Sequence, residues 1–436
     1  MKRDVYITGV GPVCGLGLGI DEVWPKLLAG QSAIAPVRAF DASAFASTLA
    51  AELPDGFKVR DFVPKTYRKA TKVMARDIEL AVAAADLAAK DAGLATAANP
   101  DAQPCYDPAR VGCHIGAGLI AADEEELTAA LVKSKRDDGS FDIHHWGQEG
   151  MKNLTPLWLL KYLPNMLACH VTIVHDLQGP SNTITCAEAS GGLSFGESLR
   201  VIQRGQADAC FCGGAESNLN PMSFMRQVFY GRLSKRNDDP PNAVRPFDQH
   251  ADGTVVGEGG GILILEAGET YANRGHHAPY AKVLGFGASQ SLNPAKRSRQ
   301  PSDDGRGPML AIKAALRDAQ LEPDAIDAVL PFGCGHPEWD AAEANAIKSV
   351  LGERVTQVPV VSTKAALGSC SAGAGALDLV LAAKALREQK LPTIVNRDQS
   401  IDGMTATEPA KLETLLVFTT GFGGQNTAAI LGRLES

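Results

Sequence analysis

The stretch that most constrains the fold of this chain is Gly179 to Arg204, GPSNTITCAEASGGLSFGESLRVIQR. Its segment Asn182 to Thr185 predicts a short buried strand, because its residues are small and partly β-branched. From Ala189 the apolar residues recur at helical spacing, and Gly205 stands where a helix commonly ends. Cys186-Ala187-Glu188 therefore occupies the corner of a strand–turn–helix elbow. Such an elbow points one side chain at a helix N-terminus, where backbone N–H groups favour negative charge.

Strand and helix patterns alternate along most of the chain. Short apolar runs predict strands at residues 5–10, 111–115, 207–213, 281–287, 325–330, 358–362 and 415–419. Longer segments with helical spacing predict helices at residues 20–28, 77–92, 165–174, 308–319, 341–351 and 373–389. This alternation indicates an α/β protein with helices on both faces of its sheets. The polar segment 266–279, between two strands, divides the chain into two similar halves, 1–266 and 267–436.

Composition and charge exclude several classes of function. A net charge of −8 over 436 residues argues against a nucleic-acid partner. The nine cysteines are scattered without C-x-x-C or zinc spacing, which predicts reduced thiols in a cytoplasmic protein and no metal centre. The N-terminal MKRDVYITGVG enters a strand without an apolar signal region, and no run approaches the ~18 apolar residues of a membrane span.

A series of further motifs is spread along nearly the whole chain. VYITGVGPVCGLGLGIDEVWPKLLAGQSAI opens it, GPSNTIT precedes the elbow, and CGGAES follows the elbow helix. RLSKRND, RPFDQHADGTVVGEGGGILILE, DAAEANAIKSVLG, VSTKAALG and GFGGQN come next, in that order. In this ordered set the chain resembles the β-ketoacyl synthases, the condensing enzymes of fatty-acid and polyketide synthesis in the thiolase superfamily. The resemblance implies a thiolase-like α/β fold, with two similar halves packed in five αβαβα layers, usually as a dimer.

The chemistry of that family uses one cysteine and two histidines. The elbow cysteine accepts the acyl chain as a thioester, and the histidines orient the malonyl group as it loses carbon dioxide. Registered on Gly179-Pro180-Ser181 and on the elbow helix, the place of the cysteine falls on Glu188. Registered on the neighbouring motifs, the two histidine positions fall on Phe332 and Ser369. All three catalytic groups of the family are therefore replaced in this chain.

Other groups of the family's pocket are kept. Lys364, Glu343 and the loop Gly421-Phe422-Gly423-Gly424, with Thr420 before it, match the motifs. In the synthases the lysine and the glutamate support the pocket by hydrogen bonding, and the N–H groups of the elbow residue and of this phenylalanine hold the thioester oxygen. A carboxylate at position 188 would accept those N–H bonds, because a helix N-terminus stabilises negative charge. We therefore expect Glu188 to be a structural plug of the oxyanion hole, with a role as general base as the alternative.

Two more side chains are candidates for residual chemistry. Cys186 lies two residues before the registered position, so a nucleophile there would need the elbow to slip, and a buried strand-end thiol is the favoured interpretation. His336 follows Phe332 on the same loop beside Pro337, where we expect a solvated or capping histidine rather than a pocket residue.

The combined pattern resembles the chain-length factors, the β-subunits of two-chain ketosynthases. These subunits carry a non-cysteine residue at the elbow, commonly Gln, and EASGGL has Glu in its place. The resemblance implies a subunit that forms a heterodimer with an active ketosynthase and lines the acyl tunnel. It needs no cofactor of its own, because acyl carrier protein delivers the phosphopantetheine arm. Two alternatives stay open: an active or divergent β-ketoacyl-ACP synthase or acyltransferase that uses Cys186 or Glu188, and a homodimer that holds an acyl chain.

One charged feature points to a partner. Lys65, Arg68, Lys69 and Lys72 recur at i, i+3, i+4 and i+7, which predicts one basic stripe on a helix. In the synthases this region resembles the surface that docks the acidic acyl carrier protein. A solvated face without a partner is the alternative interpretation.

Overall fold

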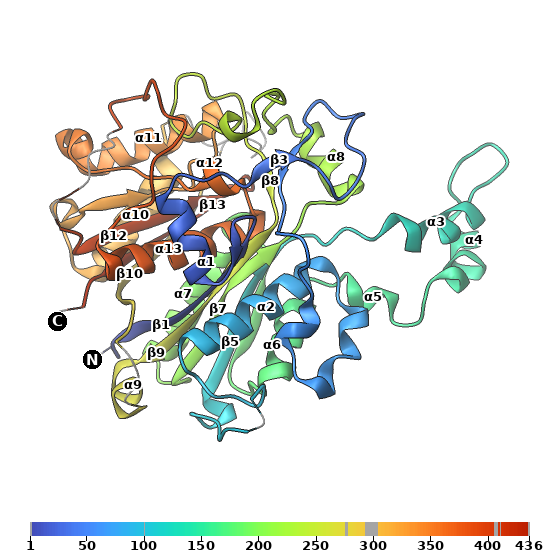
Figure 1. Ribbon diagram of the computed structural model, residues 1–436, viewed down its shortest axis with the longest axis horizontal. Coiled ribbons are helices and arrows are strands. Elements are labelled where there is room, and N and C mark those ends of the chain that lie inside the picture. The colour runs from blue at the N-terminus through green and yellow to red at the C-terminus, as the bar shows by residue number, and fades with distance from the viewer. Residues whose placement is uncertain are drawn as a thin grey trace.

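Two helices at the centre of the structure, α7 (Ser190–Gln203) and α13 (Ala374–Glu388), lie between strands on both sides (Figure 1). The computed structural model describes residues 2–99, 101–274, 278–292, 304–404, 409 and 411–434. α13 is apolar around nearly its whole circumference, as expected for a helix buried on all sides. α7 buries Phe195, Leu199 and Ile202 together with several small residues. The pair forms the middle layer of the molecule.

The strands form one long sheet of two groups. The group from the first half comprises β1 (Val5–Cys14), β5 (Val111–Ala117), β6 (Ser181–Ile184), β7 (Ala209–Glu216) and β9 (Gly259–Ala267), in the order β6-β5-β7-β9-β1. The second comprises β10 (Ala281–Gln290), β11 (Ala328–Leu330), β12 (Thr414–Thr420) and β13 (Gln425–Gly432), in the order β10-β13-β12-β11. A two-residue pairing between β1 and β10 joins the groups. The β5–β6, β5–β7 and β11–β12 pairs are parallel.

Helices also cover the outer faces of both strand groups. α2 (Arg76–Asp91) and α6 (Met166–His175) pack on the first group. On the second group α10 (Arg306–Ala319) packs against β10 and β13, and α11 (Pro337–Leu351) packs against α10. The order of layers is therefore helix, sheet, helix, sheet, helix, and the predicted αβαβα architecture is confirmed.

In each half, a glycine lets one strand pack closely against the helix on its outer face. A Cβ on Gly11 of β1 would lie 2.1 Å from the carbonyl oxygen of Ala84 in α2. A Cβ on Gly287 of β10 would lie 2.2 Å from the carbonyl oxygen of Ala311 in α10. Both strands therefore approach the helix backbone more closely than any side chain permits. The same close contact between a strand and its outer helix therefore occurs in both halves.

The remaining elements surround these layers. They are α1 (Ile20–Leu28), α8 (Pro221–Phe229), α9 (Gly268–Arg274), α12 (Lys364–Leu367), the short β2 (Gly17–Leu18) beside β1, and a small sheet of β3 (Ile34–Pro36), β4 (Leu49–Ala51) and β8 (Val256–Gly257). An arm with α3 (Glu124–Lys133), α4 (Ile143–Gln148) and α5 (Trp158–Lys161) extends away from the body (Figure 1). Side chains of its apolar residues Leu119, Val132, Ile143, Leu157 and Leu159 are more than half exposed.

Most predicted elements are present with ends shifted by a few residues, but one predicted strand and the linker differ, and several elements, β9 and β13 among them, were not predicted. Residues 358–362 do not form a strand, because Val360 pairs with Val329 of β11 through an isolated bridge that does not extend into a ladder. β13 was not predicted, since its alanine-rich sequence lacks a strong strand pattern. The expected linker 266–279 begins with helix α9, and residues 275–277 of it lie outside the described residues. The division at residue 266 stays a prediction.

The contact between β1 and α2 predicts a large cost for one added methyl group. Gly11→Ala should lower the free energy of unfolding by about 2 kcal/mol or more, because the new Cβ overlaps the α2 backbone. Gly147→Ala in α4 is the control, since no atom lies within 4 Å of its Cβ position. Chemical denaturation measures both, and equal midpoints would contradict the close approach.

Candidate functional site

The predicted elbow is present at the start of α7. β6 ends at Ile184, and Ala187 at the corner has a φ of 49°, in the left-handed region that residues with a Cβ rarely adopt. The Ser190 hydroxyl fastens the turn, since it accepts a hydrogen bond from the Cys186 N–H at 2.8 Å and donates one to the Ala187 carbonyl at 2.6 Å. This strained corner places Glu188 immediately before the helix.

The Glu188 carboxyl is buried and faces the loop after β12. Its Oε2 accepts a hydrogen bond of 2.8 Å from the backbone N–H of Phe422, and its own backbone N–H also interacts with the carboxyl. Burial raises the pKa of Glu188 above its ordinary value, while the nearby Arg232 guanidinium and the two N–H groups oppose that shift. The Glu188 carboxyl thus interacts with the backbone N–H groups of Phe422 and Glu188. These are the two donors that the sequence predicts beside the elbow side chain.

Phe332, from the second half of the chain, packs against Phe422 on the loop after β12. It follows β11, is completely buried, and its ring centroid lies 6.1 Å from that of Phe422 in an edge-to-face arrangement. Cys334, Trp339 and Ala374 complete an apolar cluster with these two rings. The side chain at this position therefore supplies packing and no proton.

Lys364 and Glu343 lie behind the cluster in separate networks. The Lys364 Nζ is 2.7 Å from both carboxylate oxygens of Asp378 and 5.4 Å from the ring centroid of Phe332. Glu343 accepts a hydrogen bond of 2.7 Å from the Gly333 N–H. Burial and the neighbouring Asp340 raise the pKa of Glu343 to about 8. Glu343 is therefore protonated at neutral pH, and Lys364 has Asp378 rather than Glu343 as its counter-ion.

Comparison with known proteins identifies the family of this chain. Residues 2–270 match the model of the beta-ketoacyl synthase N-terminal domain, and residues 280–398 match that of the C-terminal domain. The chain belongs to the β-ketoacyl synthase family. It is 33% identical over 442 residues to the 3-oxoacyl-[acyl-carrier-protein] synthase 2 of Vibrio cholerae, covering 99% of this chain and 100% of that protein.

Two further proteins, one compared by sequence and one by its solved structure, are similar to this chain. The actinorhodin polyketide putative beta-ketoacyl synthase 2 of Streptomyces coelicolor is 34% identical over 442 residues, covering 98% of each chain. The solved structure of the ishigamide ketosynthase/chain length factor superposes with a TM-score of 0.82 at 27% identity, covering 100% of both chains. The predicted thiolase-like ketosynthase fold is therefore confirmed.

The other predicted pocket residues of this β-ketoacyl synthase homologue lie in two places, at the end of β12 with the loop that follows it, and beside β8. Thr420, at the end of β12, is buried beside Glu343, whereas Gly423 lies exposed on the loop that follows. Ser369 is also buried, but its backbone pairs with Val255 and Gly257 near β8. Phe422 thus contacts both Phe332 and Glu188, and Ser369 is held by its backbone beside β8.

Cys186 and His336, the two further candidates for chemistry at the pocket, differ in their contacts. Burial raises the pKa of the half-buried Cys186 thiol, which disfavours the reactive thiolate form. His336 stands at the N-cap position of α11 and is half-buried, but its side chain makes no capping bond there, and its ring lies 5.0 Å from that of Trp339. Burial lowers the pKa of His336 because the charged form is disfavoured in this aromatic setting.

Three important residues near the site were missed from the sequence. Arg232, from the RLSKRND motif, lies with its guanidinium carbon 3.9 Å from the ring centroid of Phe422. Trp339 packs on the same ring at 4.3 Å. Asp378 could have been noticed, because an acidic residue on the otherwise apolar segment 373–383 requires a buried partner.

The basic residues Lys65, Arg68, Lys69 and Lys72 do not form one helical stripe. The segment folds as two 3₁₀ turns, η2 (Lys65–Tyr67) and η3 (Ala70–Val73), whose backbone bonds span three residues. With about three residues per turn, Lys65 and Arg68 stand in one row while Lys69 and Lys72 stand in another. All four side chains are exposed, so the basic surface exists in a different geometry.

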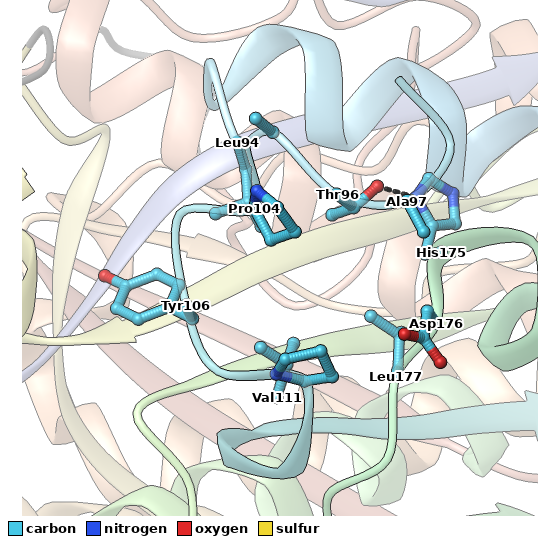
Figure 2. Close-up of a pocket in the computed structure, with 11 residues that line it drawn as sticks. Leu94, Thr96, Ala97, Pro104, Tyr106, Val111, His175, Asp176 and Leu177 are labelled. Carbon is cyan, nitrogen blue, oxygen red and sulfur yellow. Dashed lines mark hydrogen bonds between the residues drawn. The ribbon is translucent and has the colours of Figure 1, made fainter. Parts of the chain in front are cut away.

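Hollows also lie away from the elbow. A cleft of about 760 Å³ separates the base of the arm from the start of α2 and is lined by Asp77, Lys161 and Glu258 among others. Figure 2 shows a smaller pocket beside the loop after α2, where Thr96 hydrogen-bonds His175. Burial lowers the pKa of His175 to about 3, so this imidazole is neutral and does not act as an acid near neutral pH.

Two absences concern the described residues alone. None of the helices in the described part of the chain is both long and apolar enough to cross a membrane. Within that same part of the chain, no group of three or more His, Cys, Asp or Glu side chains is arranged to hold a metal ion.

The protonated state of Glu343 predicts a dependence of stability on pH. Its pKa is about 8 in the folded chain and near its ordinary value when unfolded, so between those values the folded state holds the extra proton. The stability that this proton provides is present at low pH and is lost as the pH rises toward about 8. Relative to Glu343→Gln, the wild type should lose about 1.4 kcal/mol of unfolding free energy per pH unit in this window. Denaturation of both proteins from pH 5 to 9 measures the difference, and a constant offset would contradict the raised pKa.

Proposed function

We propose that this chain is a non-condensing ketosynthase subunit of the chain-length-factor type, which pairs with an active β-ketoacyl-ACP synthase. One observation carries the proposal: the Glu188 carboxyl accepts the Phe422 N–H bond at the elbow position that the family reserves for a nucleophilic cysteine. A donor committed to this internal carboxyl does not stabilise the oxyanion of an incoming thioester.

The chemistry of the other positions supports the same proposal. Attack by a carboxylate on an acyl thioester would form an anhydride, which exchanges one activated acyl group for a more labile one. Phe332 has no group that orients or protonates a malonyl carboxylate, and a hydroxyl at Ser369 does not replace an imidazole as a general acid or base near neutral pH. With a nucleophile and two imidazoles absent together, decarboxylative condensation lacks its reacting groups.

Two surfaces fit a partner of the same fold. β6 lies at one end of the strand order, and Ser181 and Asn182 on it are exposed. A sheet edge of this kind pairs readily with the edge of another chain. The arm adds exposed apolar side chains, a pattern typical of interaction surfaces. The ishigamide ketosynthase/chain length factor is, by its name, such a pair, and we propose the same arrangement here, with a homodimer as the alternative.

Within such a subunit the two proposed domains would each supply part of the pocket. The first, residues 1–266, contributes the elbow with Glu188. The second, residues 267–436, contributes Phe332, Lys364 and Phe422. A tunnel shaped at this junction would be set by side chains that pack rather than react.

An active synthase or acyltransferase is the second candidate function. It is favoured by relatives named 3-oxoacyl-[acyl-carrier-protein] synthase 2, of which the Vibrio cholerae protein is 33% identical to this chain. In this case Cys186 or Glu188 would have to attack the acyl thioester, releasing the carrier's pantetheine thiol.

Intact-protein mass spectrometry separates the two candidates. The chain is incubated with acyl- and malonyl-carrier protein, alone and together with a co-expressed active ketosynthase. We expect no covalent adduct on the chain alone, and a stable two-chain complex that forms ketoacyl product. An acyl adduct mapped to Cys186 or Glu188 would overturn the proposal in favour of the second candidate.

The variant Glu188→Cys is the matched test of the missing histidines. It restores a thiol at the registered position, yet it should not produce ketoacyl product, because Phe332 and Ser369 still lack imidazole groups. Product from this single variant, measured with carrier-bound substrates, would show that the two histidines are dispensable here.

The basic surface predicts a contribution to carrier binding. Arg68→Glu combined with Lys72→Glu should weaken binding of the acidic acyl carrier protein about tenfold, because two attractions become repulsions. Lys313→Glu with Arg317→Glu on exposed positions of α10 changes the net charge equally and is the control. Calorimetry measures both affinities, and equal losses would leave the surface as a solvated face.

A further inference from the structure

The four cations Lys65, Arg68, Lys69 and Lys72 have no counter-ion within the chain. All four side chains are exposed, and among the described residues no carboxylate lies at ion-pair distance from any of them. The next basic residue along the chain, Arg76, differs from them, because it forms an ion pair of 2.8 Å with a buried glutamate. The four positive charges are therefore available to an anionic partner.

The turns that carry these cations are weakly held by their own backbone. η2 has three residues and η3 has four. The bonds from the Arg68 N–H to the Lys65 carbonyl and from the Lys72 N–H to the Lys69 carbonyl are both 3.4 Å long. Backbone bonds of this type are usually about 2.9 Å long, and short 3₁₀ turns have poorer bond geometry than an α-helix. The segment therefore needs support from another element to keep one conformation.

Tyr67, between Lys65 and Arg68, supplies this support. Its hydroxyl lies 2.8 Å from Nδ1 of His170 in α6, and the two rings meet edge to face with their centroids 5.9 Å apart. The Tyr67 ring also packs against the apolar core that α2 and α6 share. Within the described part of the chain, the bond to His170 is the one side-chain hydrogen bond that joins segment 64–75 to another element.

The same bond is also needed by His170. This imidazole is 3% exposed, and its Nε2 makes no hydrogen bond. Burial lowers the pKa of His170, so the ring is neutral near neutral pH. Tyr67 is thus its one hydrogen-bond partner among the described residues. Separation of the pair would leave a buried polar ring without any partner, which is unfavourable, so the turns stay against α6.

We propose that Tyr67 and His170 are positioning residues, which hold the basic segment in the conformation that binds the acidic acyl carrier protein. This inference rests on the proposed carrier docking and assigns the order of that surface to one hydrogen bond. A segment that is already ordered loses less conformational entropy when its partner binds. Neither residue has to touch the carrier, since Tyr67 is half-buried and His170 lies behind it in the core.

Calorimetric titration of the full chain with acyl carrier protein tests the role of the bond. Tyr67→Phe removes only the hydroxyl, and it should weaken the affinity about fivefold relative to the wild type. His170→Leu should weaken it equally, whereas His170→Asn should retain most of the affinity, because its amide offers a hydrogen-bonding group near the position of Nδ1. Tyr280→Phe is the matched control and should bind like the wild type, since the Tyr280 hydroxyl donates to Asp91 at the C-terminal end of α2.

Amide hydrogen exchange in the full chain measures the order of the segment in the absence of the carrier. In Tyr67→Phe, the hydrogen-bonded amides of residues 67, 68 and 72 should exchange about tenfold faster than in the wild type. The amides of α2 and α6 should stay as protected as before. Faster exchange throughout both helices would show a general loss of stability and would contradict a local positioning role.

Equal carrier affinities of the wild type and Tyr67→Phe would overturn the inference. If Arg68→Glu combined with Lys72→Glu weakens binding in the same titrations, only the positioning role fails. If this charge-reversed variant also binds like the wild type, the proposed carrier docking fails as well. The two failures are therefore distinguished by one set of measurements.

Discussion

The close packing of α7 against α13 is the contact on which the rest of the structure depends. A Cβ on Gly191 of α7 would lie 2.8 Å from that of Ala376 and 3.0 Å from the Ala376 backbone nitrogen in α13. Glycine at this position lets α7 meet the backbone of α13. Since one helix comes from each half, this contact brings the elbow of the first half to the loops of the second.

The buried charges of the site are compensated one by one. Lys364 pairs with Asp378, Glu343 keeps its proton, and Glu188 receives N–H bonds with Arg232 nearby. Buried ionisable groups are costly unless they are paired, neutralised or hydrogen-bonded, so each of these arrangements is needed for folding irrespective of catalysis. The retention of Lys364 and Glu343 is therefore explained by their interior surroundings and does not require that they take part in a reaction.

Under the proposed function, packing takes the place of chemistry in this pocket. Phe332 would stand at the position of one histidine, while the Glu188 carboxyl accepts the Phe422 N–H bond that would otherwise hold a thioester oxygen. Selection on such a pocket would act on shape, since its contacts are mainly apolar. A subunit of this kind influences a partner's product through the tunnel wall that it offers.

The sequence alone determined the elbow, the layered α/β fold and the Phe422 loop that faces Glu188, and it predicts that Glu188, Phe332 and Ser369 replace the catalytic groups of the family. These follow from local patterns and ordered motifs, because a strand, a turn and a helix are specified by neighbouring residues. Tertiary structure alone decided that Arg232 and Trp339 enclose Phe422, that His336 joins them, and that Lys364 is neutralised by Asp378. It also resolved the basic segment into two 3₁₀ turns rather than a helix. The physical reason is that each of these depends on contacts between residues far apart in the chain, whose partners are set only when the two halves pack together.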